Sequence, residues 1–274
     1  MLSDILMFMV LSWLTLVGLV VLVQRRVIFA PPKKTRVLEP GPWQSTLVVE
    51  KTICRISSSV HLEGWQSKLE PGIAKRGTII YFGGRKENVA WAPNMSSYLH
   101  GWEVVAFNYR GFGGSTGIAT EQSVVADGLA IYDEYAHRAE FEVGCEIVVM
   151  GRSLGSGIAV RVANERMPEK LVLVSPYASI AAVVRGKWYL LPASLFVRHN
   201  FKAIRFAPGF SGEALVLITP GDSEVKASTS RKLAAALGGK TEVEEIDGEH
   251  HRSLPRSPKL QRRLASFLDR AGPL

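Results

Sequence analysis

The sequence Ile-Val-Val-Met-Gly-Arg-Ser-Leu-Gly at residues 147–155 decides the fold of this chain. Its first four residues form an apolar run typical of a buried strand, and the composition of residues 156–163 favours a helix. Ser153 lies at the corner between them, flanked by Gly151 and Gly155. Glycines permit the close backbone approach and strained conformation that such a corner requires. The pattern predicts a nucleophile elbow, a turn that presents a reactive serine at the edge of a sheet.

Strand and helix patterns alternate through the second half of the chain. We expect strands at 47–54, 60–65, 77–82, 103–109, 147–150, 170–175, 214–219 and 241–246, and helices at 89–99, 121–138, 156–163, 226–237 and 258–268. Alternation with short links predicts a doubly wound α/β fold, whose mostly parallel sheet is covered on both faces. Residues 175–215 lack a strand pattern, so we expect a short helical cap excursion there.

A serine hydroxyl needs a base within hydrogen-bond reach and a third group that orients the base. Asp222 follows one expected strand, and His250 and His251 follow the last one. Carboxyl ends of parallel strands meet at one edge of a sheet, and the chain order Ser, acid, His is the order this architecture requires. We therefore expect Ser153, Asp222 and one of the two histidines to meet.

Alternatives remain for two of these positions. Glu224 lies in the same turn as Asp222 and is a rival acid, while Asp222 itself could only cap the helix that follows. His250 and His251 are both candidates for the base. The remaining histidines fit ordinary surface or half-buried positions: His61, His100, His137 and His199.

The N-terminal segment predicts a membrane anchor. Residues 5–23 carry no charge, and a helix of this length covers about 28 Å, close to the hydrocarbon thickness of a bilayer. No basic residue precedes it, and no clear cleavage site follows, so we expect an uncleaved single-pass anchor at 1–26. The basic residues just after it favour a cytoplasmic location for the globular domain. Residues 27–44 contain four prolines and fit a tether, which leaves 45–274 for the domain.

Composition excludes other classes of protein. Lys and Arg exceed Asp and Glu by 33 to 25, a net charge of +8, but there is no basic stripe with interleaved aromatics and no zinc-type spacing. We expect no nucleic-acid partner and no metal. The basic residues near the apolar segment and the C-terminus are equally consistent with anionic lipid nearby.

Three further motifs carry a family resemblance. Residues 108–117 read Asn-Tyr-Arg-Gly-Phe-Gly-Gly-Ser-Thr-Gly, similar to a D-Y-R-G-x-G-x-S-x-G loop with Asn108 in place of Asp, and residues 172–179 resemble the strand and turn after the nucleophile. Residues 248–254 resemble a G-x-x-H-N-x-[LI] ending, in a register that selects His251. Over about residues 45–270 the chain resembles the α/β-hydrolase superfamily, specifically its small membrane-anchored α/β-hydrolase domain-containing proteins.

This resemblance implies a serine hydrolase of esterase, thioesterase or lipase type, with Ser153 as nucleophile, His251 as base and Asp222 as the orienting acid. It implies no cofactor, and a small-molecule, lipid or acyl ester as substrate. An acyltransferase with the same triad, or a catalytically silent binding protein, are the alternatives. The glycines of the 108–117 loop allow it to turn, and its Arg110 is expected to pair with a carboxylate such as Asp127.

The expected oxyanion site departs from the family pattern. Residues 83–88 read Gly-Gly-Arg-Lys-Glu-Asn where the family has H-G-N. An oxyanion hole uses backbone N–H donors, so the backbone shape matters more than the side chains. We expect the donors to be the N–H groups of Arg85 and Leu154. The apolar residues 188–192 and 195–197 either pack on the sheet or form an acyl pocket or bilayer-facing surface.

Overall fold

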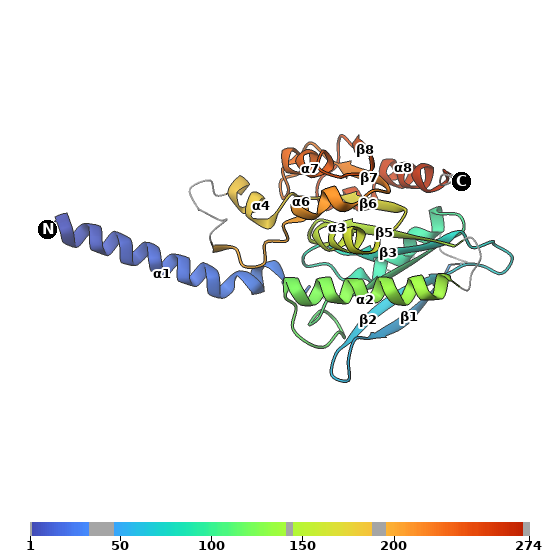
Figure 1. The fold of residues 1–274 in the computed structure, drawn as a ribbon, viewed down its shortest axis with the longest axis horizontal. Helices are drawn as coiled ribbons and strands as arrows, with labels where there is room; N and C mark the ends of the chain where they lie inside the picture. Colours follow the sequence, from blue (N-terminus) through green and yellow to red (C-terminus); the bar gives the residue numbers. More distant parts are fainter. Residues whose placement is uncertain (1, 33–46, 141–144, 188–195, 271–274) are drawn as a thin grey trace.

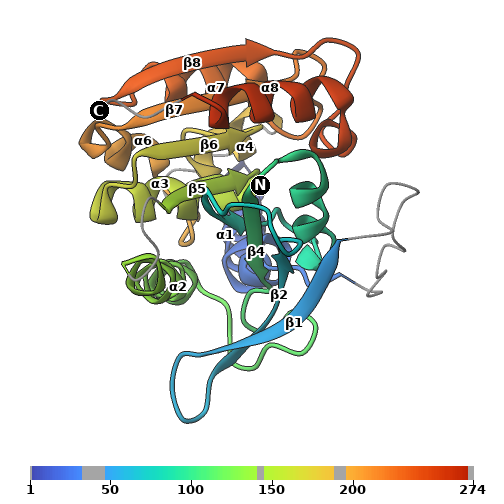
Figure 2. The same cartoon turned by 90° about the vertical axis from the view of Figure 1, so that its right-hand side faces the viewer.

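The computed structural model describes residues 2–32, 47–140, 145–187 and 196–270. The strands in these ranges form one eight-stranded sheet (Figure 1). The strands are β1 (Val48–Arg55), β2 (His61–Lys68), β3 (Gly77–Phe82), β4 (Trp102–Phe107), β5 (Glu146–Arg152), β6 (Lys170–Val174), β7 (Glu213–Ile218) and β8 (Lys240–Glu245). Their order across the sheet is β1-β2-β4-β3-β5-β6-β7-β8 (Figure 2). The β1–β2 and β2–β4 pairs are antiparallel, and the other pairs are parallel.

Helices cover both faces of the sheet. The helices among the described residues are α1 (Leu2–Ile28), η1 (Val89–Tyr98), α2 (Glu121–Ala139), α3 (Leu154–Arg166), α4 (Ile180–Lys187), α6 (Ala203–Phe206), η2 (Ala207–Gly209), α7 (Ala227–Ala234), η3 (Leu254–Arg256) and α8 (Pro258–Leu268). Buried side chains of α2, α3 and α7 form one core, and those of η1 and α8 form the other. Central strands such as β4 and β6 are buried along their whole length. The predicted doubly wound α/β fold is confirmed.

The helix expected at 89–99 differs in type. It is a 3₁₀ helix over Val89–Tyr98, and the side chain of Asn88 caps it by accepting a hydrogen bond from the Ala90 N–H at 3.0 Å. Pro93 lies inside it. Proline has no N–H to donate, and in an α-helix its ring would clash with the preceding turn. The more tightly wound 3₁₀ helix therefore forms here in place of an α-helix.

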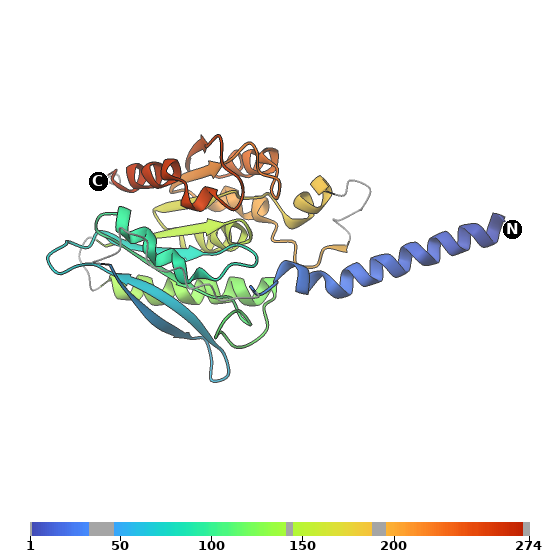
Figure 3. The same ribbon diagram turned by 180° about the vertical axis from the view of Figure 1, so that it is seen from behind.

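Helix α1 is long and apolar enough to cross a membrane, by length and composition. It projects from one end of the domain (Figures 1 and 3). It continues past the expected boundary at residue 26, and Ile28 and Phe29 are buried in the larger core. The first residues of the expected tether therefore pack on the domain, and the part of it at 33–44 lies outside the described residues.

The expected excursion between β6 and β7 contains α4, α6 and η2. Its apolar residues 188–192 and Leu195 lie outside the described residues. Phe196, which follows, contacts α1: its ring meets the Trp13 ring edge-on, with centroids 5.8 Å apart. This part of the excursion therefore lies against the N-terminal helix.

Candidate active site

Ser153 occupies the tight corner between β5 and α3. Its backbone has φ 47° and ψ −116°, a conformation that L-residues rarely adopt and that marks local strain. Gly155 is required because a Cβ on it would lie 2.0 Å from the carbonyl oxygen of Phe82 at the end of β3. The Ser153 N–H donates to the carbonyl of Val174 at 2.9 Å, which fixes the corner to β6. The serine side chain is thus held at the carboxyl edge of the sheet.

The structure brings the three expected side chains together at this edge. The Nε2 atom of His251 lies 3.0 Å from Ser153 Oγ, and its Nδ1 atom lies 2.7 Å from Asp222 Oδ2. The Asp222 side chain is 2% exposed and that of His251 11%, so both are shielded from water. A hydroxyl, an imidazole and a carboxylate in this sequence can pass a proton from the serine to the histidine while the carboxylate stabilises the imidazolium.

Asp222 is fixed by its own turn. Its Oδ1 atom accepts hydrogen bonds from the N–H groups of Glu224 and Val225, both at 2.8 Å. Burial acts to raise the pKa of Asp222, but its hydrogen bonds to His251 and the Val225 N–H outweigh burial and lower the pKa below its ordinary value. The carboxylate therefore stays charged. It does not cap α7, which has no side-chain cap, and the backbone N–H of Glu224 is one of its donors.

The neighbouring histidine does not contact the serine. The backbone N–H of His250 donates to Ser253 Oγ at 2.9 Å, and its ring lies beside Gly221. The carbonyl of Glu249 accepts a hydrogen bond from Thr219 Oγ1 at 2.7 Å, which ties the histidine loop to the end of β7. Within the described ranges no cluster of three or more His, Cys, Asp or Glu side chains is arranged to hold a metal ion.

The two residues expected to supply oxyanion donors flank the serine. Leu154 is the first residue of α3. The loop that contains Arg85 lies against Ser153, because a Cβ on Gly84 would be 3.5 Å from the Ser153 Cβ. Tyr109 holds this loop by donating from its hydroxyl to the carbonyl of Gly83 at 2.6 Å. Backbone from both expected donor segments therefore lies next to Ser153.

A buried ion pair joins the loops around Ser153. The Nη1 atom of Arg152 lies 2.7 Å from Glu87 Oε2, and its Nη2 atom donates to the carbonyl of His251 at 2.7 Å. The same Glu87 oxygen accepts from the Gly84 N–H at 2.5 Å. One arginine therefore connects the Ser153 corner, the loop at 83–88 and the histidine loop.

Sequence reasoning did not single out this pair. The other Glu87 oxygen accepts hydrogen bonds from the Tyr81 hydroxyl and the Trp91 indole N–H, at 2.8 and 2.9 Å. Burial acts to raise the pKa of Glu87, but the charge of Arg152 and the hydrogen bonds from the Gly84 N–H and the Tyr81 hydroxyl lower it below its ordinary value. An arginine at the end of an apolar strand was the available signal, since a charge there needs a partner.

We expect Glu87→Gln to lower the free energy of unfolding by about 3–5 kcal/mol at pH 7, because it leaves Arg152 buried without a countercharge. Since the native pKa of Glu87 is depressed, its contribution is present above the unfolded value near 4.5 and is lost as the pH falls through the native value. Urea unfolding of both proteins across this pH range measures the difference. Glu165→Gln, in the half-exposed Arg161–Glu165 pair, is the control and should cost less than about 1 kcal/mol.

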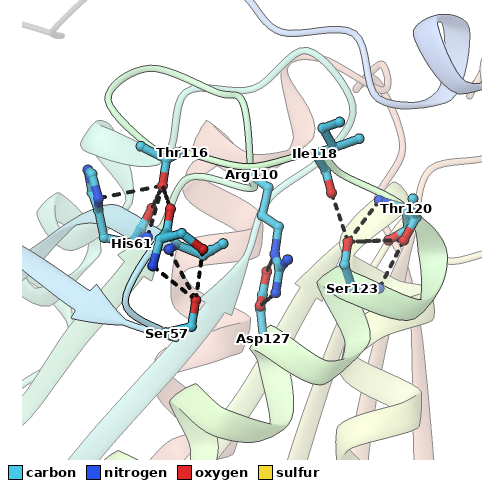
Figure 4. Close-up of polar contacts among 10 residues, drawn as sticks. Ser57, His61, Arg110, Thr116, Ile118, Thr120, Ser123 and Asp127 are labelled. Atoms are coloured by element: carbon cyan, nitrogen blue, oxygen red, sulfur yellow. Dashed lines mark hydrogen bonds and ion pairs between the residues drawn. The ribbon is translucent and has the colours of Figure 1, made fainter.

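The loop at 108–117 is fixed to α2 and to the β1–β2 hairpin. Arg110 forms a two-pronged pair with Asp127, with nitrogen–oxygen distances of 2.8 and 2.6 Å, as expected from the sequence (Figure 4). Thr116 Oγ1 accepts a hydrogen bond from the His61 N–H at 3.0 Å (Figure 4). The loop is therefore tied to both of these elements.

Asn108 stands where the resembling loops have aspartate, and its surroundings explain the difference. Its Oδ1 atom accepts from the Val89 N–H at 3.2 Å, and its Nδ2 atom donates to Glu63 Oε2 at 3.3 Å. An aspartate could not donate to Glu63 and would add a second negative charge beside it.

Comparisons with known proteins agree with this fold. The family described as "Serine aminopeptidase, S33" matches residues 73–208. An uncharacterized protein of Mycobacterium tuberculosis is 28% identical over 235 residues, which cover 83% of this chain and 80% of that protein. Lysophosphatidylserine lipase ABHD12 of Macaca fascicularis is 24% identical over 201 residues, covering 63% of this chain and 50% of the lipase.

Among solved structures, the Pyrococcus furiosus esterase Pf2001 superimposes with a TM-score of 0.65. It is 20% identical and is covered over 98% of its length, with 89% of this chain matched, which shows a shared fold. The fold and these relatives define a hydrolase built on a doubly wound sheet. The chain belongs to the α/β-hydrolase superfamily.

Proposed function

We propose that this protein is a membrane-anchored serine hydrolase that cleaves a carboxylic ester or thioester. The observation that carries the proposal is the unbroken contact from Ser153 Oγ through His251 to Asp222. In this mechanism Ser153 attacks the substrate carbonyl while His251 takes the hydroxyl proton at Nε2. Asp222 accepts the Nδ1 hydrogen bond and stabilises the imidazolium that results.

The rest of the cycle uses the same groups. Backbone N–H groups of Arg85 and Leu154 stabilise the tetrahedral oxyanion, and His251 returns the proton to the departing alcohol or thiol. An acyl-enzyme remains on Ser153. A water molecule, deprotonated by His251, then attacks this acyl group. The bond between the acyl carbon and Ser153 Oγ breaks as His251 returns the proton to Oγ, and the carboxylic acid product leaves. The arrangement requires no cofactor.

The proposed domain division follows α1. Residues 1–26 would lie in or next to the membrane as a single-pass anchor, residues 27–44 would connect it to the domain, and residues 45–274 would form the hydrolase domain. The exposed apolar side chains along α1, among them Phe8 at 72% and Leu22 at 80%, support a lipid surround. The basic flank of this helix favours a domain on the cytoplasmic face.

Lipid or acylated substrates fit this proposal. A relative is a lysophosphatidylserine lipase. An anchor that holds the domain at a bilayer raises the local concentration of substrates that reside there.

A panel of p-nitrophenyl esters, from acetate through butyrate and octanoate to palmitate, tests this function on the full chain in detergent micelles. We expect hydrolysis with release of the free acid, and covalent labelling by a fluorophosphonate probe. Transfer of the acyl group to an added alcohol in preference to water would identify an acyltransferase. A wild-type protein that neither turns over esters nor reacts with the probe would identify a silent binding protein and overturn the proposal.

A further inference from the structure

A basic cavity lies beside α1, on the side of the domain formed by α3 and α6. Its volume is about 320 Å³. Its lining includes Glu121, Arg161, Arg198, Lys202, Arg205 and Phe206. Four of these side chains are cations and one is an acid, so the cavity is strongly positive.

Most of this positive charge is not neutralised. Arg161 pairs with Glu165 at 2.7 Å and also stacks over the Phe206 ring, with its guanidinium carbon 3.9 Å from the ring centroid. Among the described acidic side chains, none forms an ion pair with Arg198, Lys202 or Arg205. Three cations around one hollow repel one another, so an anion bound there would relieve that repulsion.

The cavity is attached to the polar end of α1. The Arg198 N–H donates to Gln24 Oε1 at 2.7 Å, and Gln24 Nε2 donates to the carbonyl of Phe196 at 3.3 Å. Gln24 is the first polar residue after the apolar stretch 5–23, so Arg198 lies level with the end of that stretch. The phosphates of a bilayer crossed by α1 would be at the same level.

The positive charge around His199 also places the end of α1 beside the cavity. Burial lowers the pKa of His199, and the positive charges of Arg25 and Arg198 lower it further against the opposing charge of Glu121. Arg25, from the last turn of α1, therefore adds to the positive field beside the cavity.

We propose that this cavity binds the phosphate of an anionic membrane phospholipid, held by Arg198, Lys202 and Arg205. The inference rests on the membrane span proposed above. Guanidinium groups match phosphate oxygens in pairs, and lysine adds a point charge. A lipid phosphate held there would seat the domain on the membrane beside its anchor.

A second hollow shows that basic residues alone do not make such a site. It has a volume of about 430 Å³, and Lys259, Arg262 and Arg263 line it together with Glu244, Glu245 and Asp247. Its cations and acids are balanced, and Arg263 pairs with Glu242. This hollow supplies control positions for the experiment.

The test measures phosphatidic acid bound to the full chain by native mass spectrometry, after release from neutral detergent micelles doped with dioleoyl phosphatidic acid or dioleoyl phosphatidylcholine. The variant combines Arg198→Gln, Lys202→Gln and Arg205→Gln. The control combines Lys232→Gln, Lys259→Gln and Arg262→Gln, the same change in charge at exposed sites elsewhere. We expect the first variant to lose phosphatidic acid affinity by about tenfold or more and the control to stay within about twofold.

Three results would overturn the lipid site. These are equal losses in both variants, no loss in either, and displacement of phosphatidic acid by millimolar glycerol 3-phosphate, which would identify a soluble phosphate as the ligand. Two further measurements separate this proposal from the proposed function. Ser153→Ala should bind phosphatidic acid like the wild type, whatever its activity. Extraction of the full chain from membranes by alkaline carbonate would overturn the span and with it the position of the site.

Discussion

Replacing Ser153 with alanine is expected to reduce kcat for a soluble p-nitrophenyl ester by about 10⁵- to 10⁶-fold, the loss that removal of a triad serine produces. The substitution deletes the hydroxyl that lies 3.0 Å from His251 Nε2 and therefore the atom that becomes acylated. Labelling by a fluorophosphonate probe should disappear with it. Residual turnover would come from the binding site and the backbone donors around the missing hydroxyl.

The matched control is Ser266→Ala, on the exposed face of α8. It should keep wild-type turnover and labelling. Both variants should unfold at temperatures close to that of the wild type, because neither change opens a large cavity. Undiminished labelling of Ser153→Ala would remove the nucleophile assignment.

The second large effect separates two adjacent histidines. His251→Ala is expected to lower kcat by about 10⁴- to 10⁶-fold, because it removes the group between Ser153 and Asp222. His250→Ala should change kcat by less than about tenfold, since its ring makes no contact with the serine hydroxyl. Steady-state kinetics on one ester, with circular dichroism to verify folding, measures both. The opposite ranking would transfer the base to His250 and contradict the geometry.

The elbow and its partners could be predicted from the sequence because short local motifs define each of them. A serine between two glycines, after an apolar run, leaves few backbone solutions, and Gly155 meets the Phe82 carbonyl as such a turn requires. Chain order and the parallel sheet then placed Asp222 and the histidine loop at one edge. The choice between His250 and His251 rested on a resemblance in register, and coordinates were needed to measure it.

Contacts between distant segments were harder to anticipate. The ion pair between Glu87 and Arg152 joins a loop to a strand 65 positions further on. Neither segment contains a local sequence pattern that identifies its partner. The packing of Phe29 is similar, because its ring meets those of His199 and Phe201. The prolines after residue 30 favoured an extended spacer in the sequence analysis. In the structure, the apolar residues Ile28 and Phe29 are instead buried against the domain.

The seating of Phe29 bears on how a water-soluble version of this enzyme could be prepared. A truncation that begins the chain at residue 45 would remove the Phe29 ring, which contacts His199 and Phe201. It would expose apolar surface of the domain and promote aggregation. It would also take away the Val27 carbonyl, to which Arg85 donates at 3.1 Å, and so release a side chain of the very loop next to Ser153. Removing only the residues before Gln24 would instead discard the apolar part of α1 and keep Phe29 in place on the domain.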